Sequence, residues 1–199
     1  NNLSHYHEFP ELPDVGINYS TSDDESAWDE VIPPVVSMIS KLKGAGIKLR
    51  CGGVVNEAFP SVEQVAAMIQ TCALIDIPMK CTAGLHHPIR HFADEYDAYM
   101  HGFINTFGAG VFTSNFPEPR DSQEKFKMFI LLSHMVSDQE AHHFEFENGG
   151  MVWKVGDDRG TTFEFDNESI NNCRKKVMIS YGSCSFQEPI DDLEQLGWM

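Results

Sequence analysis

The fold is decided by residues 47–82, in which two short stretches, Ile47-Lys48-Leu49-Arg50 and Met79-Lys80-Cys81-Thr82, flank one segment with helical periodicity. In each stretch apolar and polar residues alternate, as they do in strands with one buried face. Between them, Ser61 and Gln64 have the spacing of a helix capping box, and apolar residues then recur every three or four positions. A strand, a helix and a strand in this order predict a βαβ unit with parallel strands.

The remaining elements follow from the same kind of pattern. Alternating residues at 143–155, with a turn at Asn148-Gly149-Gly150, predict an antiparallel hairpin that residues 161–165 extend. Apolar spacing and end signals predict a strand at 3–9 and helices at 31–42, 96–112 and 122–137. They also predict a helix containing Ile170, Cys173 and Val177, with Gly182 as its C-cap, and a short helix at 191–196.

The predicted fold class is α/β: a small parallel sheet resembling part of a (β/α) barrel, with an added antiparallel hairpin. A chain of 199 residues is long enough to bury a substantial core. We therefore expect a single domain spanning residues 1–199. A partial barrel leaves sheet edges exposed, and because a twin subunit can cover such edges, we also expect a homodimer.

Composition restricts the partners and the compartment. The formal net charge of −16 argues against nucleic acids and anionic membranes, and no stretch approaches the roughly 20 apolar residues of a membrane span. The five cysteines are scattered without a C-x-x-C pair, which indicates neither a disulfide framework nor a zinc knuckle. We therefore expect a cytoplasmic protein, and no particular cofactor is indicated.

A candidate site lies where the predicted parallel strands end, because ligands bind at the carboxyl edge of such sheets. Lys80 and Thr82 point to one face of their strand, and burying an unpaired lysine is costly. The carboxyl ends bring together residues from the three expected strands: Glu8; Arg50, Gly52 and Gly53; and Lys80, Thr82, Gly84, His86 and His87. We expect Arg50 and Lys80 to hold an anionic group, with amides near the glycines as extra donors.

Three alternatives stay open for these side chains. The opposite charges on neighbouring strands would form purely structural ion pairs. A desolvated Lys80 would suit Schiff-base or general-base chemistry. The histidines at 86, 87, 91 and 101 would be metal ligands, although their spacing matches no known zinc motif.

Ser183-Cys184-Ser185 offers two hydroxyls, a thiol and turn amides directly after Gly182. Since a helix is predicted before it and no second glycine follows, the segment does not match the G-x-S-x-G nucleophile elbow. The alternative is a C-cap turn that satisfies the carbonyls of the preceding helix.

Several motifs together resemble an uncharacterised, mainly bacterial protein family. They are Lys48-Leu49-Arg50-Cys51-Gly52-Gly53, Phe59-Pro60-Ser61, Lys80-Cys81-Thr82-Ala83-Gly84-Leu85-His86-His87-Pro88, His101-Gly102-Phe103-Ile104-Asn105, and Gly182-Ser183-Cys184-Ser185-Phe186 followed by Glu188-Pro189. The resemblance covers most of the chain from about residue 47, and the chain resembles an N-terminally shortened member. It implies no established activity, but it implies that one constellation contains Arg50, Lys80, His86, His87, His101, Asn105, Ser183 and Glu188.

The leading expectation is an enzyme that binds a small anionic metabolite, with lyase or aldolase-like chemistry through Lys80. His86 and His87 are its other candidate catalytic residues. The candidate ligand-binding residues are Glu8, Arg50, Gly52, Gly53, Thr82, His101, Asn105, Ser183, Cys184 and Glu188. The alternatives are a non-catalytic ligand-binding or assembly module and a metal-dependent hydrolase built on the region of His86 and His87.

Overall fold

The computed structural model describes residues 26–116, 118–156 and 160–199, with side chains from residue 31 onward. Its elements are α1 (Ser26–Ile39), β1 (Ile47–Arg50), η1 (Asn56–Ala58), α2 (Val62–Leu74), β2 (Met79–Thr82), β3 (His91–Ala93), β4 (Ala98–Met100), α3 (Phe103–Asn115), α4 (Ser122–Ser137), η2 (Ala141–His143), β5 (Phe144–Glu147), β6 (Gly150–Val155), β7 (Thr161–Phe165), α5 (Asn167–Lys176), β8 (Met178–Gly182) and α6 (Gln187–Gln195). The expected strand at 3–9, with Glu8, lies outside the described residues.

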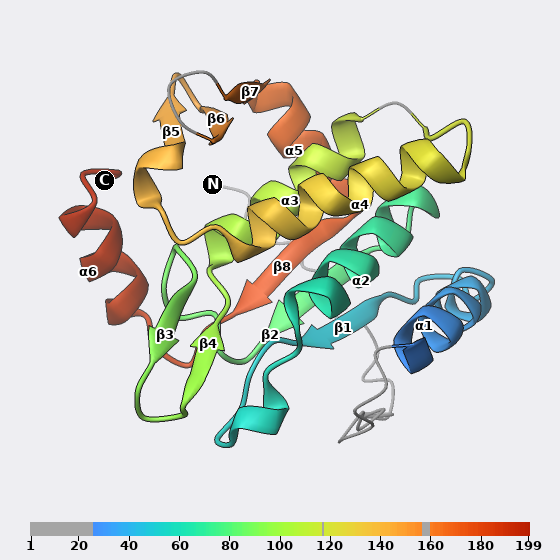
Figure 1. The fold of residues 1–199 in the computed structure, drawn as a ribbon, viewed down its shortest axis with the longest axis horizontal. Coiled ribbons are helices and arrows are strands. Elements are labelled where there is room, and N and C mark those ends of the chain that lie inside the picture. Colours follow the sequence, from blue (N-terminus) through green and yellow to red (C-terminus); the bar gives the residue numbers. More distant parts are fainter. Residues whose placement is uncertain (1–25, 117, 157–159) are drawn as a thin grey trace, which may run out of the picture.

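A parallel sheet of three strands, in the order β1-β2-β8, forms the centre of the molecule. The α/β class with a small parallel sheet is therefore confirmed. Helices α2, α3 and α4 lie on the side of the sheet that faces the reader in Figure 1. All three strands point toward the end of the molecule where β3, β4 and α6 lie.

The βαβ unit forms as the sequence predicts. Ser61 caps α2 through both halves of a capping box with Gln64, whose backbone N–H donates to the Ser61 hydroxyl. The buried face of α2 packs with the apolar residues of the sheet in one hydrophobic core that extends from Ile32 to Met178. Burying this apolar area is the main favourable term in folding, at roughly 25 cal/mol per Å².

The added antiparallel part is also present, as a sheet in the order β5-β6-β7. Trp153 and Phe165 of this sheet are buried, and Phe112 of α3 packs edge-on against both rings. Aromatic contacts therefore join the antiparallel sheet to the helical layer.

Two expected elements are corrected. The helix expected at 96–112 begins only at Phe103, because Gly102 is its N-cap and the residues before it form the β3-β4 hairpin. The aromatic side chains of Tyr99 and Phe103 have helical spacing, but they belong to different elements. Phe92 and Tyr99 pair across the hairpin with ring centroids 5.1 Å apart.

The second correction concerns Gly182, which ends a strand and caps no helix. Helix α5 stops at Lys176, and the apolar residues after it form β8, which pairs with β2. Met178, the first residue of β8, is 0% exposed, as expected for a parallel strand covered by helices. The third parallel strand of the described sheet is thus β8. In the described ranges, no helix combines the length and apolarity needed to cross a membrane.

Candidate active site

Two chain segments leave neighbouring strands at the same edge of the sheet and meet there. After β2, Ala83 and Gly84 both adopt left-handed backbone angles, with φ of 59° and 69°, and the chain then reaches His86 and His87. After β8, the chain passes through Cys184 and enters α6. Because a strand and not the expected helix ends at Gly182, this segment is a strand-turn-helix connection. It lies at the carboxyl edge of the sheet, where ligand sites are typically built.

Three side chains contact one another at this edge, in the order Cys184, His86, Glu188. The Cys184 Sγ atom is 3.2 Å from Nε2 of His86, and the opposite ring nitrogen, Nδ1, is 2.8 Å from Oε2 of Glu188. Nδ1 thus donates to the carboxylate, and Nε2 is the ring nitrogen nearer to the thiol. The sulfur is also 3.8 Å from Nδ1. It therefore lies beside Nε2 and not in the direction of the lone pair on that nitrogen. Such contacts are often poorly aligned before substrate binds.

Exposure distinguishes Cys184 from the other cysteines. Cys51, Cys72, Cys81 and Cys173 are buried, whereas Cys184 is exposed. Burial raises the pKa of Cys72 to about 12, which keeps it in the unreactive thiol form. Of the five thiols, Cys184 therefore has both access to solvent and a histidine beside it.

The hydroxyls next to Cys184 order the turn. Ser183 Oγ accepts from the N–H of Ser185, and Ser185 Oγ accepts from the N–H of Glu188. The hydrogen bond from His86 is the main factor that lowers the pKa of Glu188 below its ordinary value of 4.5, and Ser185 contributes further. A carboxylate that stays ionised can keep the imidazole oriented.

A second histidine-carboxylate pair is formed by the residue after His86 and by an aspartate one helical turn after Glu188. Nδ1 of His87 is 2.5 Å from Oδ2 of Asp192, and the ring of His91 packs edge-on against His87 with centroids 4.2 Å apart. Glu188 and Asp192 are four residues apart on α6 and therefore share one face of the helix. One helix thus fixes both adjacent histidines.

Aromatic rings border the edge. The pKa of Tyr96 is raised, first by a hydrogen bond with Glu95 and then by desolvation, with further contributions from Glu95, Cys184 and Glu188. The ring of Phe59 lies 5.6 Å from that of Tyr96. Phe59 also covers Gly52, where a Cβ would come within 2.8 Å of the ring.

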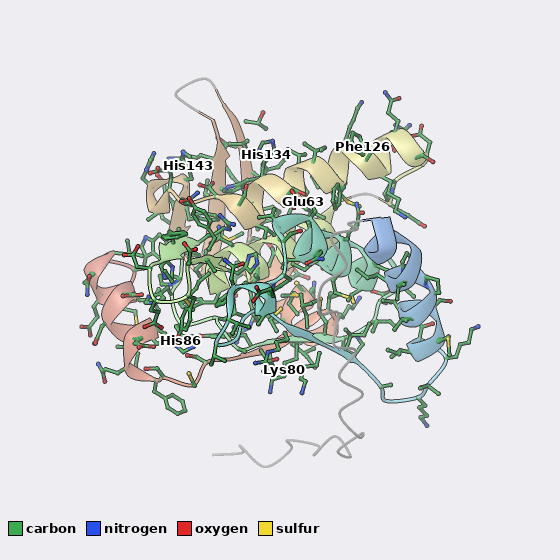
Figure 2. The ribbon with its side chains drawn as sticks, turned by 60° about the horizontal axis from the view of Figure 1, so that its bottom comes forward. Glu63, Lys80, His86, Phe126, His134 and His143 are labelled. Carbon is green, nitrogen blue, oxygen red and sulfur yellow. The ribbon has the colours of Figure 1, made fainter. Side chains whose placement is uncertain are left out.

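The basic side chains lie on the face of the sheet away from α2 and α4. Figure 2 shows Lys80 on this face and His86 beside α6. Lys80 and Arg50 are exposed. Arg50 Nε donates to the carbonyl of Gly52, and its Nη2 lies close to Gly53. The Thr82 hydroxyl donates to the carbonyl of Leu49, so it is turned back into the sheet.

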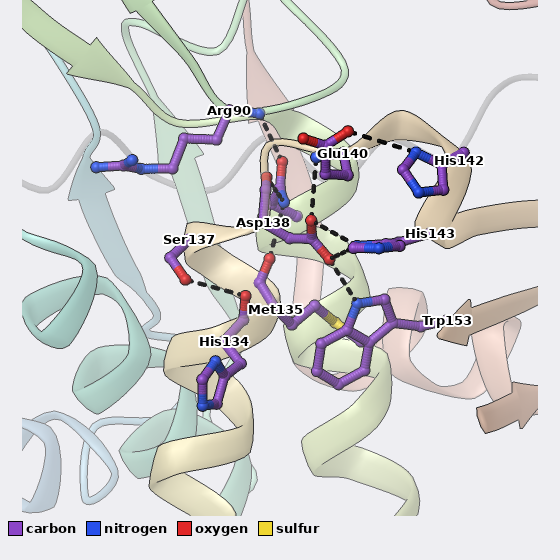
Figure 3. Close-up of polar contacts among 10 residues, drawn as sticks. Arg90, His134, Met135, Ser137, Asp138, Glu140, His142, His143 and Trp153 are labelled. Carbon is purple, nitrogen blue, oxygen red and sulfur yellow. Dashed lines mark hydrogen bonds and ion pairs between the residues drawn. The ribbon is translucent and has the colours of Figure 1, made fainter. Parts of the chain in front are cut away.

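His101 and Asn105 are built into the core. His101 is 1% exposed and Nε2 donates to the carbonyl of Pro60 over 2.7 Å. Asn105 is fully buried. Its Nδ2 donates to the carbonyls of Met135 and Asp138, and its Oδ1 accepts from the N–H of Arg90. These contacts, drawn in Figure 3, join α3 to the end of α4 and to the segment after β2 that carries His86 and His87.

Asp138 lies at the centre of a further polar cluster. Its carboxylate accepts from Nδ1 of His143 at 3.0 Å and from Nε1 of Trp153 at 3.1 Å, as Figure 3 shows. These bonds tie the antiparallel sheet to the end of α4. Among the described residues, no group of three or more histidines, cysteines or carboxylates is arranged to hold a metal ion.

The structure thus brings His86, His87, Cys184 and Glu188 together, with Ser183 in the same turn. It sets Lys80, Arg50, Gly52 and Gly53 around the same edge, while His101 and Asn105 serve the core. The sequence reasoning missed Asp192, Tyr96 and Phe59. The spacing of Glu188 and Asp192 was a signal for a shared helix face, but only the fold shows which residues that face meets. Comparison of the chain with protein-family models, with curated proteins and with solved structures gave no match.

Proposed function

We propose that the protein is an enzyme that uses Cys184 as a nucleophile in acyl transfer or hydrolysis. The observation that carries the proposal is the sequence of contacts from the exposed Cys184 thiol to His86 and from His86 to Glu188. A nucleophile, a base within reach of it and a third group that orients the base are the parts that such chemistry needs.

The steps follow from the order of these groups. His86 Nε2 takes the proton of the Cys184 thiol, and the sulfur attacks the carbonyl carbon of the substrate. The bond from that carbon to its leaving group then breaks, and the leaving group takes the proton from His86. Water, deprotonated by His86, next attacks the thioester that has formed on Cys184, and the thiol is regenerated as the carboxylic acid departs. An ester, a thioester or an amide and one water thus become an acid and an alcohol, a thiol or an amine.

Glu188 acts in this proposal by orienting His86. Its carboxylate accepts from Nδ1, which fixes the tautomer with the lone pair on Nε2, and it stabilises the imidazolium once His86 has taken the proton. The low pKa of Glu188 supports this role, because the carboxylate stays ionised through the range in which a histidine ordinarily titrates.

The experiment that tests the proposal is native alkylation of Cys184 by iodoacetamide, followed by intact mass. Because the thiolate is the reactive form and an adjacent imidazolium stabilises it, Cys184 should react at least about tenfold faster than in His86→Asn. Glu188→Gln should give an intermediate rate. Hydrolysis of chromogenic acetyl esters and thioesters should be lost in Cys184→Ala, by about a hundredfold or more.

Two control variants remove a carboxylate and an imidazole that do not contact Cys184 or His86. Glu194→Gln changes a carboxylate on the same helix, and His142→Asn changes an exposed histidine outside the site. Both should react like the wild type. Equal alkylation rates in the wild type and in a folded His86→Asn variant would overturn the proposal and favour a non-catalytic ligand-binding or assembly module.

A further inference from the structure

The edge of the sheet near Cys184 carries positively charged side chains, which the proposed Cys184 chemistry does not require. In the register of the parallel sheet, Lys80 stands opposite Lys48 and Ser180, and Arg50, Thr82 and Gly182 stand opposite one another in the last row before the strands end. Residues in these two rows point to the same face. These two rows therefore carry three basic residues, Lys48, Lys80 and Arg50, of which Arg50 lies in the row that ends the sheet.

The side chain of Lys80 extends toward the edge that carries Cys184. Its Cε atom would lie 3.9 Å from a Cβ built at Gly182, which is two residues further along the neighbouring strand. The aliphatic stem therefore lies along the sheet toward the carboxyl ends, and Gly182 leaves room for it. Cys184 follows two residues after that glycine, in the turn just beyond the same edge of the sheet.

Neither basic group is neutralised. Within the described part of the chain, Lys80 and Arg50 take part in no ion pair, and the one hydrogen bond of the Arg50 side chain goes to a neutral carbonyl. Glu188 and Asp192, two acids near this edge, are bound to His86 and His87. Two cations at one edge of a chain with a net charge of −16 oppose the charge of the molecule as a whole.

We infer that Lys80 and Arg50 form an anion subsite beside Cys184, so that the substrate is a small acyl compound carrying a carboxylate or phosphate group. The inference rests on the proposed function, because it names the substrate class of the same site. Arg50 presents a planar guanidinium and Lys80 a mobile ammonium, the two groups with which proteins bind such anions. Because Lys80 is exposed, the inference gives it the role of a binding group.

Two alkylating reagents of the same size test this inference. Iodoacetamide is neutral and iodoacetate carries one negative charge, and both transfer their carbon to the Cys184 sulfur with loss of iodide. The measured quantity is the rate with iodoacetate divided by the rate with iodoacetamide, compared among the wild type, Lys80→Gln and Arg50→Gln. The distant charge of Lys175, at the end of α5, is removed in the matched control Lys175→Gln.

The expected result is a ratio that falls about three- to tenfold in Lys80→Gln and less strongly in Arg50→Gln, with no change in Lys175→Gln. The wild-type ratio should also fall as salt is added. The nature of the anion follows from protection: whichever of inorganic phosphate and succinate slows iodoacetamide in the wild type, but not in Lys80→Gln, identifies the group that the subsite prefers.

The two proposals fail in different ways. If Cys184 reacts rapidly with iodoacetamide in a manner that depends on His86, but the ratio is the same in all variants, the anion subsite is overturned and the nucleophile stands. If Cys184 does not react faster than in His86→Asn, the proposed function itself is overturned. Circular dichroism of each variant establishes that the comparison is made between folded proteins.

Discussion

At the scale of single residues, His86 donates a hydrogen bond to the carboxylate of Glu188 and has the Cys184 thiol beside its ring. The carboxylate of Glu188 is exposed, so salt and water weaken its charge interaction with the imidazole. The geometry of the hydrogen bond, and its effect on which ring nitrogen carries the proton, do not depend on burial. The value of Glu188 to the site is therefore orientation more than stability.

This role predicts how Glu188 titrates. Its carboxyl group should titrate below 4.5, and in His86→Asn its pKa should move part of the way back, because the contact with Ser185 remains. Since a lowered carboxyl pKa favours the folded, ionised form until the pH falls through that pKa, the Glu188-His86 contact should persist from pH 8 to pH 5. Carbon NMR of the glutamate side chains measures this, with Glu188→Gln identifying the signal. An unchanged pKa in His86→Asn would remove His86 as its cause.

His101 gives a separate prediction, for stability. Desolvation lowers its pKa from an ordinary 6.5 to about 4, so the unfolded chain binds a proton that the folded protein rejects. The free energy of unfolding should therefore fall by about 2 kcal/mol between pH 7.5 and pH 5 on account of this residue. Urea unfolding at both pH values should show this loss in the wild type and not in His101→Gln, which keeps an N–H for the carbonyl of Pro60. The same loss in both proteins would contradict the assignment.

At the scale of elements, the turn after β2 decides whether the histidines reach the thiol. Gly84 has a φ of +69°, and a Cβ there would lie 3.0 Å from both the Cys51 carbonyl oxygen and the Cα of Gly52. Left-handed angles are costly for residues with a side chain, and here backbone atoms that cannot move aside add a steric cost.

Two substitutions separate these costs. Gly44 has a similar φ of +77° with nothing within 4 Å, so Gly44→Ala should cost only the conformational strain, about 1 kcal/mol. Gly84→Ala should cost about 2–4 kcal/mol and slow the alkylation of Cys184, because the segment that carries His86 is displaced. Urea unfolding compares the two variants. Equal losses of stability would show that the close approach of β1 and β2 is not rigid.

At the scale of the whole molecule, the parallel sheet is small and its edges matter. In the order β1-β2-β8, each outer strand has one edge with no strand beside it in the described ranges. Such edges invite pairing unless something covers them. A second copy of the chain would cover these edges without any other partner, and this is the physical basis on which we predict a homodimer.

The dimer prediction is tested by sedimentation over a range of concentrations. The expected mass is twice 22.4 kDa, about 45 kDa. Since each copy carries a net charge of −16, added salt should strengthen the association by screening the repulsion. A mass of 22.4 kDa that does not change with concentration or with salt would contradict the prediction.

Much of this organisation follows from local sequence signals. The alternation at 47–50 and 79–82, the capping pair Ser61 and Gln64, and the Asn148-Gly149-Gly150 turn each specify an element through contacts within a few residues, and each element forms. The carboxyl edge as the place of the site also follows, because parallel strands end together.

Tertiary structure alone decided what meets at that edge. Residues 178–182 form a strand because burial against α3 and β2 outweighs a local pattern that would also fit the end of a helix. His86 and Cys184 are 98 positions apart, and His86 and Glu188 are 102 apart, so their contacts depend on the pairing of β2 with β8. Local propensity carries no information about such pairs, because the contact energy appears only when distant segments are packed together.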